Sequence, residues 1–145
     1  MSHFSKVRVN VKSRSALIKG LRRMGFSKHQ IEVSDQKMTL KGYQGDDREQ
    51  RANVRIKGSG WGEDQNYVGG ASNDLGFELL EDGTYAFHVS DYDQGKYGKN
   101  WQEKFTAQYE REMFKETAEA QGFFIESEVE DEVTGRIELI FSSPF

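Results

Sequence analysis

Alternation of apolar and polar residues in two segments constrains the fold of this chain more than any other feature. In residues 6–12, valines occupy every second position, between Lys, Arg and Asn. Residues 51–57 repeat the pattern, with Ala, Val and Ile at the even positions and Arg, Asn or Lys at the odd ones. A side-chain period of two predicts β-strands with one buried and one solvated face. Such strands are typical of antiparallel sheets.

Two helices are predicted from apolar residues that recur every three or four positions. The first extends to Met24, with Ser13 or Ser15 as its N-cap. The second begins at an Asn100 cap and extends to about Ala120. It has apolar residues four positions apart, which predicts a core-facing stripe: Trp101, Phe105, Tyr109 and Met113.

Further strands are predicted in pairs: 31–33 with 38–40, 77–80 with 85–89, and 123–129 with 136–141. Residues 34–37 and 81–84 are the predicted turns of the first two pairs, and Asp82-Gly83 in the second suits a positive φ. We therefore predict an α+β fold, an antiparallel sheet with two helices packed on one face. A helix followed by glycine and two strands occurs twice, which suggests a β-α-β-β pseudo-duplication.

The length of 145 residues predicts a single domain, residues 1–145. Residues 58–74 lack periodicity and are rich in glycine, so we expect a flexible loop there. Trp61 and Tyr67 lie within it. Large aromatic side chains are frequent anchors of protein interfaces, so both are candidate partner-binding residues. The alternative is that Trp61 folds back onto the core.

The composition narrows the functional classes. Cysteine is absent, which excludes disulfides, thiolate metal sites and Cys nucleophiles. No apolar run approaches the roughly 20 residues of a membrane helix, and the first residues have neither secretory nor transit-peptide composition. We expect a cytoplasmic protein.

Charge is divided unevenly along the chain. Residues 1–60 hold 14 Lys+Arg against 5 Asp+Glu, whereas residues 61–145 hold 6 against 19. One explanation is neutralisation within the fold, if the outward-pointing glutamates of the last two strands lie beside the basic strands: Glu126, Glu128, Glu130 and Glu138. The other is a surface that meets a charged partner, either an acidic protein or a nucleic acid. Its candidate residues are Arg8, Arg51, Arg55 and Lys57.

Catalytic and metal signals are weak. His88, Asp91 and Asp93 follow one another at the end of a predicted strand, a spacing that could hold Zn²⁺ or Mn²⁺. The same segment also has ordinary turn chemistry. No catalytic constellation is evident, and we expect neither a cofactor nor enzymatic activity.

The opening Met1-Ser2-His3-Phe4-Ser5-Lys6-Val7 is distinctive. With it, the chain resembles an uncharacterised family, a conserved hypothetical open reading frame of algal plastid genomes that is also found in cyanobacteria, other bacteria and phages. The similarity continues through further segments: Gly42-Tyr43, Asp74-Leu75-Gly76-Phe77, Gln108-Tyr109, Gln121-Gly122-Phe123 and Arg136-Ile137-Glu138-Leu139.

This resemblance implies no activity, cofactor or catalytic residue. Bacterial relatives tend to be encoded near an AAA-type ATPase, which implies an adaptor. The family's distribution implies a cyanobacterial cytoplasm or a plastid stroma as the location. The chain departs from the family at Tyr109-Glu110-Arg111, where Tyr-Ala-Tyr is expected, and its glycine-rich loop is longer, which suits a phage member.

We therefore expect a non-enzymatic protein-interaction or adaptor module, with no membrane insertion. A nucleic-acid-binding protein that uses the basic strands is the first alternative. A small metal-dependent enzyme at His88, Asp91 and Asp93 is the second.

Overall fold

The computed structural model describes residues 3–142 and confirms the α+β class. Its contacts divide these residues into two compact units. Unit 1 comprises the chain up to Lys12 together with Phe26–Trp101. Unit 2 comprises Ser13–Gly25 together with the chain from Gln102 onward. Among the described helices, none is long and apolar enough to cross a membrane.

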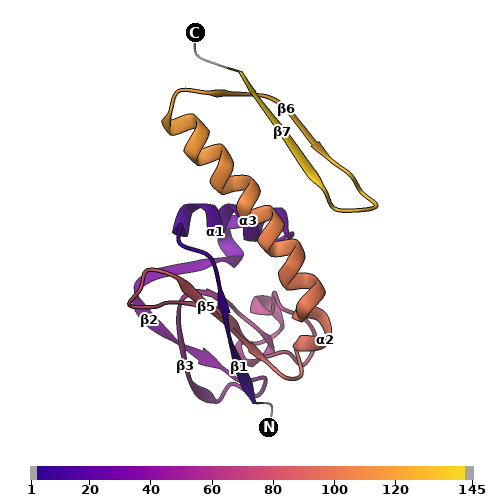
Figure 1. Ribbon diagram of the computed structural model, residues 1–145. Coiled ribbons are helices and arrows are strands. Elements are labelled where there is room, and N and C mark those ends of the chain that lie inside the picture. Colours follow the sequence, from indigo (N-terminus) through magenta and orange to yellow (C-terminus); the bar gives the residue numbers. More distant parts are fainter. Residues whose placement is uncertain (1–2, 143–145) are drawn as a thin grey trace. The chain divides into compact units, whose positions relative to one another are not determined.

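Unit 1 is built on a five-stranded antiparallel sheet in the order β1-β5-β4-β3-β2 (Figure 1). Its strands are β1 Phe4–Val9, β2 Glu32–Lys41, β3 Asp47–Ile56, β4 Leu75–Leu79 and β5 Tyr85–Ser90. Short helices lie in its connections: η1 Lys28–Gln30, η2 Ser59–Trp61, η3 Glu63–Gln65 and α2 Gln94–Tyr97. Four consecutive strands form a meander, and β1 joins it beside β5.

One register row across this sheet is entirely apolar, and its central members are part of the core. Its members are Val7, Phe87, Phe77, Val54 and Val33, from β1 to β2. The central Phe77 and Phe87 are about 1% exposed and their rings stack 4.7 Å apart. Burial of such a side chain contributes about 1.5–3 kcal/mol. The predicted alternation describes β1 and β3 correctly, because Val7 and Val54 both lie in this apolar row.

The adjacent register row consists of the other set of alternating residues. Its members are Lys6, His88, Gly76, Arg55 and Glu32. The two basic strands β1 and β3 are not neighbours, because β4 and β5 lie between them. The residues that neutralise Lys6 and Arg55 come from within unit 1, from Glu78 on β4 and Glu32 on β2.

The predicted hairpin turn at residues 34–37 is wrong. These residues form an irregularity inside β2, where the register with β3 shifts between Val33 and Met38. The buried Asn53 side chain fills the gap, because its Nδ2 donates to the carbonyl oxygens of Ser34 and Asp35 at 3.2 Å. The turn that joins β2 to β3 follows Lys41 instead, with the Gly42 amide donating to the Asp46 carbonyl at 2.8 Å.

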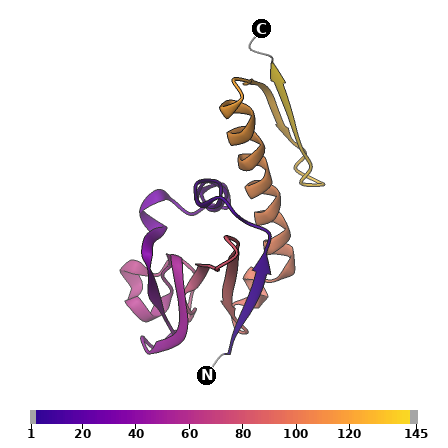
Figure 2. The ribbon, with the colours of Figure 1, turned by 60° about the vertical axis from the view of Figure 1, so that its left-hand side comes forward.

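The helix α1 (Arg14–Arg23) crosses the long helix α3 (Lys99–Ala120), which belongs to unit 2 from Gln102 onward (Figures 1 and 2). Ser13 is the N-cap of α1, as predicted, and its Oγ accepts from the Ala16 amide. Gly20 allows close approach: an added Cβ would lie 3.3 Å from the backbone of Tyr109. The second helix ends as predicted, but Asn100 lies inside α3 and is not its cap.

The strands β6 (Phe124–Glu130) and β7 (Ile137–Ser142) pair only with each other within the described residues. They lie alongside α3 in both views (Figures 1 and 2). The strands that follow α3 therefore do not extend the sheet of unit 1, although the β-α-β-β order recurs in the chain. The predicted cross-strand neutralisation of β1 and β3 by these strands is wrong for the same reason.

The uneven charge of the sequence nearly disappears when it is counted by unit. Unit 1 has 12 Lys+Arg and 13 Asp+Glu, a net charge of −1. Unit 2 has 8 and 11, a net charge of −3. Because Ser13–Gly25 carries four Lys+Arg into the acidic unit, the basic and acidic stretches of the chain are mixed by folding.

Candidate functional site

The loop 58–74 holds Trp61 among three cations. Lys41 Nζ, Arg55 Cζ and Lys57 Nζ lie 5.1, 4.7 and 4.3 Å from a Trp61 ring centroid. Each such contact contributes about 0.5–2 kcal/mol. Carboxylates neutralise these cations: Glu32 is 2.7 Å from Arg55 and 3.3 Å from Lys57, and Asp47 is 3.0 Å from Lys41.

Asp74 anchors this loop through hydrogen bonds from the interior of unit 1. It is fully buried, and its two oxygens accept from the amides of Gly58 and Lys41 at 2.8 Å and from Trp61 Nε1 at 3.0 and 3.1 Å. Burial raises the pKa of Asp74, although these hydrogen bonds oppose the rise. The indole nitrogen, the only polar atom of the Trp61 side chain, is thus used inside unit 1.

The glycines of this loop serve close contacts between backbone segments. A Cβ on Gly60 would lie 2.2 Å from the Gly42 carbonyl oxygen, and one on Gly58 would lie 2.6 Å from the Asn73 backbone. Neither contact tolerates a side chain. The glycine content that predicts flexibility therefore also has a packing explanation.

The predicted partner-binding residues separate into three places. Trp61, Arg55 and Lys57 come together, and the Tyr67 amide donates to the Lys57 carbonyl at 2.9 Å. The Tyr67 ring lies edge-on to His29. Two residues lie elsewhere: Arg8 pairs with Asp82 at 3.3 Å, and Arg51 lines a polar cavity beside His88.

That cavity, about 470 Å³, lies over a cluster centred on Glu78. Glu78 is 2.9 Å from His88 Nε2, 2.8 Å from Lys37 and 3.7 Å from Lys6. Burial lowers the pKa of His88 more than Glu78 raises it, so the imidazole is held neutral. Its Nε2 is occupied by Glu78, and its Nδ1 is buried without a hydrogen-bond partner.

The structure does not bring the metal candidates together. His88 bonds to Glu78, whereas the buried Asp93 accepts from the Ser90 hydroxyl at 2.7 Å and the Asn73 amide at 2.9 Å. Asp91 is exposed, and its carboxylate is 3.5 Å from the Ser5 hydroxyl. Within residues 3–142, no group of three or more His, Cys, Asp or Glu side chains is arranged to hold a metal ion.

In unit 2, an ion-pair network joins α3 to the hairpin. The buried Arg111 pairs with Glu128 and, at 3.2 Å, with Glu130. Arg23 of α1 pairs with Glu112 at 2.6 Å. Burial of Glu128 raises its pKa, but Arg111, Lys115 and Arg23 together outweigh that effect and the pKa is lowered. Glu128 and Glu130 therefore face α3, and the prediction that they point outward is wrong.

The outer face of the β6–β7 hairpin carries exposed apolar side chains. Glu128 pairs in register with Leu139 and Glu130 with Ile137, and both pairs face α3. Side chains alternate along a strand, so the positions between them point away from α3. The register shift between Ile125 and Ser127 places Phe124, opposite Ser142, on this same side. These positions define the outer face: Phe124, Ser127, Val129, Glu138, Ile140 and Ser142.

The exposed apolar side chains of the described residues concentrate in unit 2. Eight large apolar residues are exposed, and five of them lie on α3, β6, β7 or the turn between the strands. Phe124, Val129 and Ile140 of the outer face are 64%, 58% and 45% exposed. A gathered apolar face is informative, whereas scattered apolar residues are not.

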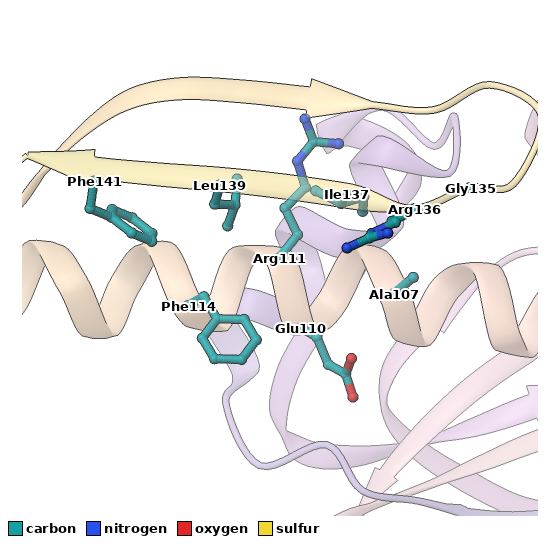
Figure 3. Close-up of a pocket in the computed structure, with 9 residues that line it drawn as sticks. All are labelled: Ala107, Glu110, Arg111, Phe114, Gly135, Arg136, Ile137, Leu139 and Phe141. Carbon is teal, nitrogen blue, oxygen red and sulfur yellow. The ribbon is translucent and has the colours of Figure 1, made fainter.

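A groove of about 420 Å³ separates β7 from α3 on the inner side of the hairpin. Leu139 and Phe141 point from β7 toward α3, and Arg111 reaches from α3 to the hairpin (Figure 3). Phe114, which is 63% exposed, also lines it. The hairpin is therefore incompletely covered on both sides.

Our sequence analysis missed this surface. Its signal is the run of apolar residues at 123–125 and again at 139–141. Consecutive residues of a strand point to opposite faces, so three apolar residues in a row place at least one on the outer face.

These features define an α+β protein whose second unit has a net negative charge and a hairpin with an exposed apolar face. The chain belongs to the family described as "Protein of unknown function (DUF1257)", whose model matches residues 21–140. The distinctive opening lies before the matched segment, and Met1 and Ser2 lie outside the described residues. No curated protein and no solved structure matches the chain significantly.

Proposed function

We propose that this protein is a protein-interaction or adaptor module that binds its partner through the β6–β7 hairpin. The observation that supports this proposal is the exposed apolar outer face formed by Phe124, Val129 and Ile140. A two-stranded hairpin is marginally stable alone and needs packing against another element. The ion pairs of Arg111 hold the inner side on α3, and a partner would cover the outer side.

The resemblance to the plastid and cyanobacterial reading frame makes an AAA-type ATPase one partner to test. It would place the interaction in a cyanobacterial cytoplasm, a plastid stroma or a phage-infected cell. The loop 58–74 remains a second candidate surface. Tyr67→Ala tests it more cleanly than Trp61→Ala, because Trp61 also supplies a hydrogen-bond donor to the buried Asp74.

Site-specific photocrosslinking tests the proposal. A photoreactive amino acid at Val129, on the outer face, is expected to yield a discrete cross-linked product in cells of the source organism. The same photoreactive amino acid, placed at the exposed position Glu119 of α3, is the control. Mass spectrometry of the product identifies the partner. Equal labelling from both positions, no product, or a product containing only two copies of this chain would contradict the proposal.

A further inference from the structure

The charge around the hairpin specifies the kind of partner. Residues 124–142 contain six Asp+Glu and one Arg. Glu128 and Glu130 are engaged by Arg111 on the inner side. Three other glutamates are exposed and form no ion pair within residues 3–142: Glu126, Glu132 and Glu138. The apolar outer face is therefore bordered by negative charge that the fold leaves unneutralised.

Register places one of these charges within the apolar face itself. Glu138 pairs directly with Val129, and the neighbouring outer position on β7 is Ile140. Side chains on directly opposed strand positions are about 5 Å apart. A partner that covers Val129 and Ile140 must therefore also meet the Glu138 carboxylate. Desolvation of that carboxylate is costly unless a cation accompanies it.

We propose that the outer face of the hairpin binds an amphipathic protein segment whose apolar side chains are flanked by Lys or Arg. This inference rests on the proposed function and specifies the partner's chemistry. The partner's apolar side chains cover Phe124, Val129 and Ile140, and its cations pair with Glu138. Complementary charge of this kind raises the association rate and excludes acidic competitors.

Two other occupants fit the same face less well. A second copy of the chain would bring a second acidic hairpin against the first, so like charges would oppose each other at the contact. An anionic lipid surface or a nucleic acid would meet the same repulsion. A basic amphipathic segment satisfies both the apolar and the acidic side chains.

Three synthetic peptides of about 18 residues, or five helical turns, test the inference. The first has a leucine stripe and Lys at its polar positions, the second has the same stripe with Glu, and the third contains the residues of the first in an order without a stripe. Binding to the full chain is measured by fluorescence anisotropy at about 0.15 M salt. The first peptide is expected to bind at least tenfold more tightly than the other two.

Variants of the chain localise the binding. Ile140→Ser and Glu138→Lys are each expected to weaken binding of the first peptide about tenfold, and circular dichroism checks that both variants fold. Asp64→Lys in unit 1 is the matched control, because it changes the total charge as Glu138→Lys does. It is expected to have less than a twofold effect.

Several outcomes would overturn the inference. Equal binding of the peptide without a stripe would mean general attraction to an acidic chain, and equal binding of the Glu peptide would mean that the charges are irrelevant. A dimer by light scattering that Ile140→Ser converts to a monomer would assign the face to a second copy. A partner cross-linked from Val129 without peptide discrimination would leave the proposed function standing and defeat only this inference.

Discussion

At the scale of single residues, His88 makes stability depend on pH. Burial lowers its pKa in the folded state, so the unfolded chain binds this proton more readily than the folded chain does. The free energy of unfolding therefore falls as pH falls through the unfolded-state pKa of about 6.5, and levels off below the folded-state pKa. Protonation would also place an N–H on Nδ1, which has no acceptor.

We expect the urea midpoint of unfolding to be lower at about pH 5.5 than at about pH 7.5, with a smaller difference in His88→Gln. The glutamine amide can still donate to Glu78 but does not titrate. His3→Gln, at an exposed position, is the control and should keep the full difference. A His88→Gln variant with the wild-type pH dependence would refute this account.

Asp74 is a second buried titratable residue with a specific role. In the wild-type chain, both carboxylate oxygens of Asp74 accept hydrogen bonds from N–H donors. The Asp74→Asn substitution replaces one of these oxygens with an NH₂ group, which cannot accept. An N–H would then face an N–H, at a cost of about 1–3 kcal/mol. Denaturant unfolding should show this loss, accompanied by a change in Trp61 fluorescence. Asp64→Asn, at an exposed position of the same loop, should be neutral.

At the scale of elements, sequence patterns correctly predict the features that depend on residues close by in the chain. The alternation in β1 and β3, the Ser13 cap and the turn at residues 81–84 all depend on neighbours in the chain, and the structure contains each of them. In that turn the Leu80 amide donates to the Thr84 carbonyl at 2.8 Å, and Gly83 has a φ of 85°.

The features that sequence reasoning misses depend on distant partners. Residues 34–37 resemble a turn, but Asn53 keeps them within β2. Trp61 lies near Arg55 and Lys57, which the sequence also marks as candidate binding residues, but its orientation depends on the hydrogen bond to Asp74. Alternation shows that Glu128 and Glu130 share a face; only the position of Arg111 shows that this face is the inner one.

Arg111 is expected to hold the hairpin on α3. Arg111→Ala removes the cation of the partly exposed Glu130 and leaves Glu128 with only Arg23 and Lys115, at 3.4 and 3.6 Å, which should cost about 1–3 kcal/mol. Hydrogen exchange should show the loss first in the β6 and β7 amides. Lys104→Ala, at an exposed position of α3, is the control. Unchanged exchange in β6 and β7 would mean that Arg111 is not needed to hold the hairpin on α3.

The same ion-pair network makes the stability of the fold decrease at acidic pH. Arg111 lowers the pKa of Glu128 in the folded state, so its contribution is present above the unfolded-state value near 4.5 and is lost as pH falls through the folded-state value. The wild-type chain should therefore lose more stability between about pH 5 and pH 3 than Arg111→Ala does. Equal losses would contradict the pairing.

At the scale of the whole molecule, folding mixes the charges that the sequence separates. Each unit is slightly acidic, with net charges of −1 and −3. The most concentrated cations, around Trp61, are matched by Glu32 and Asp47, with the buried Asp74 behind them. A basic surface for phosphates therefore does not follow from the basic opening segment of the chain.

We accordingly expect the wild-type chain to pass through a heparin column at about 50 mM salt, where screening is modest, and to leave double- and single-stranded DNA probes unshifted. A double variant, Glu32→Gln with Asp47→Asn, removes the carboxylates from Arg55, Lys57 and Lys41 without changing side-chain size. It should be retained and then elute as salt rises, because bound polyanions release counterions. Retention of the wild-type chain with a steep salt dependence would instead make nucleic-acid binding the better function.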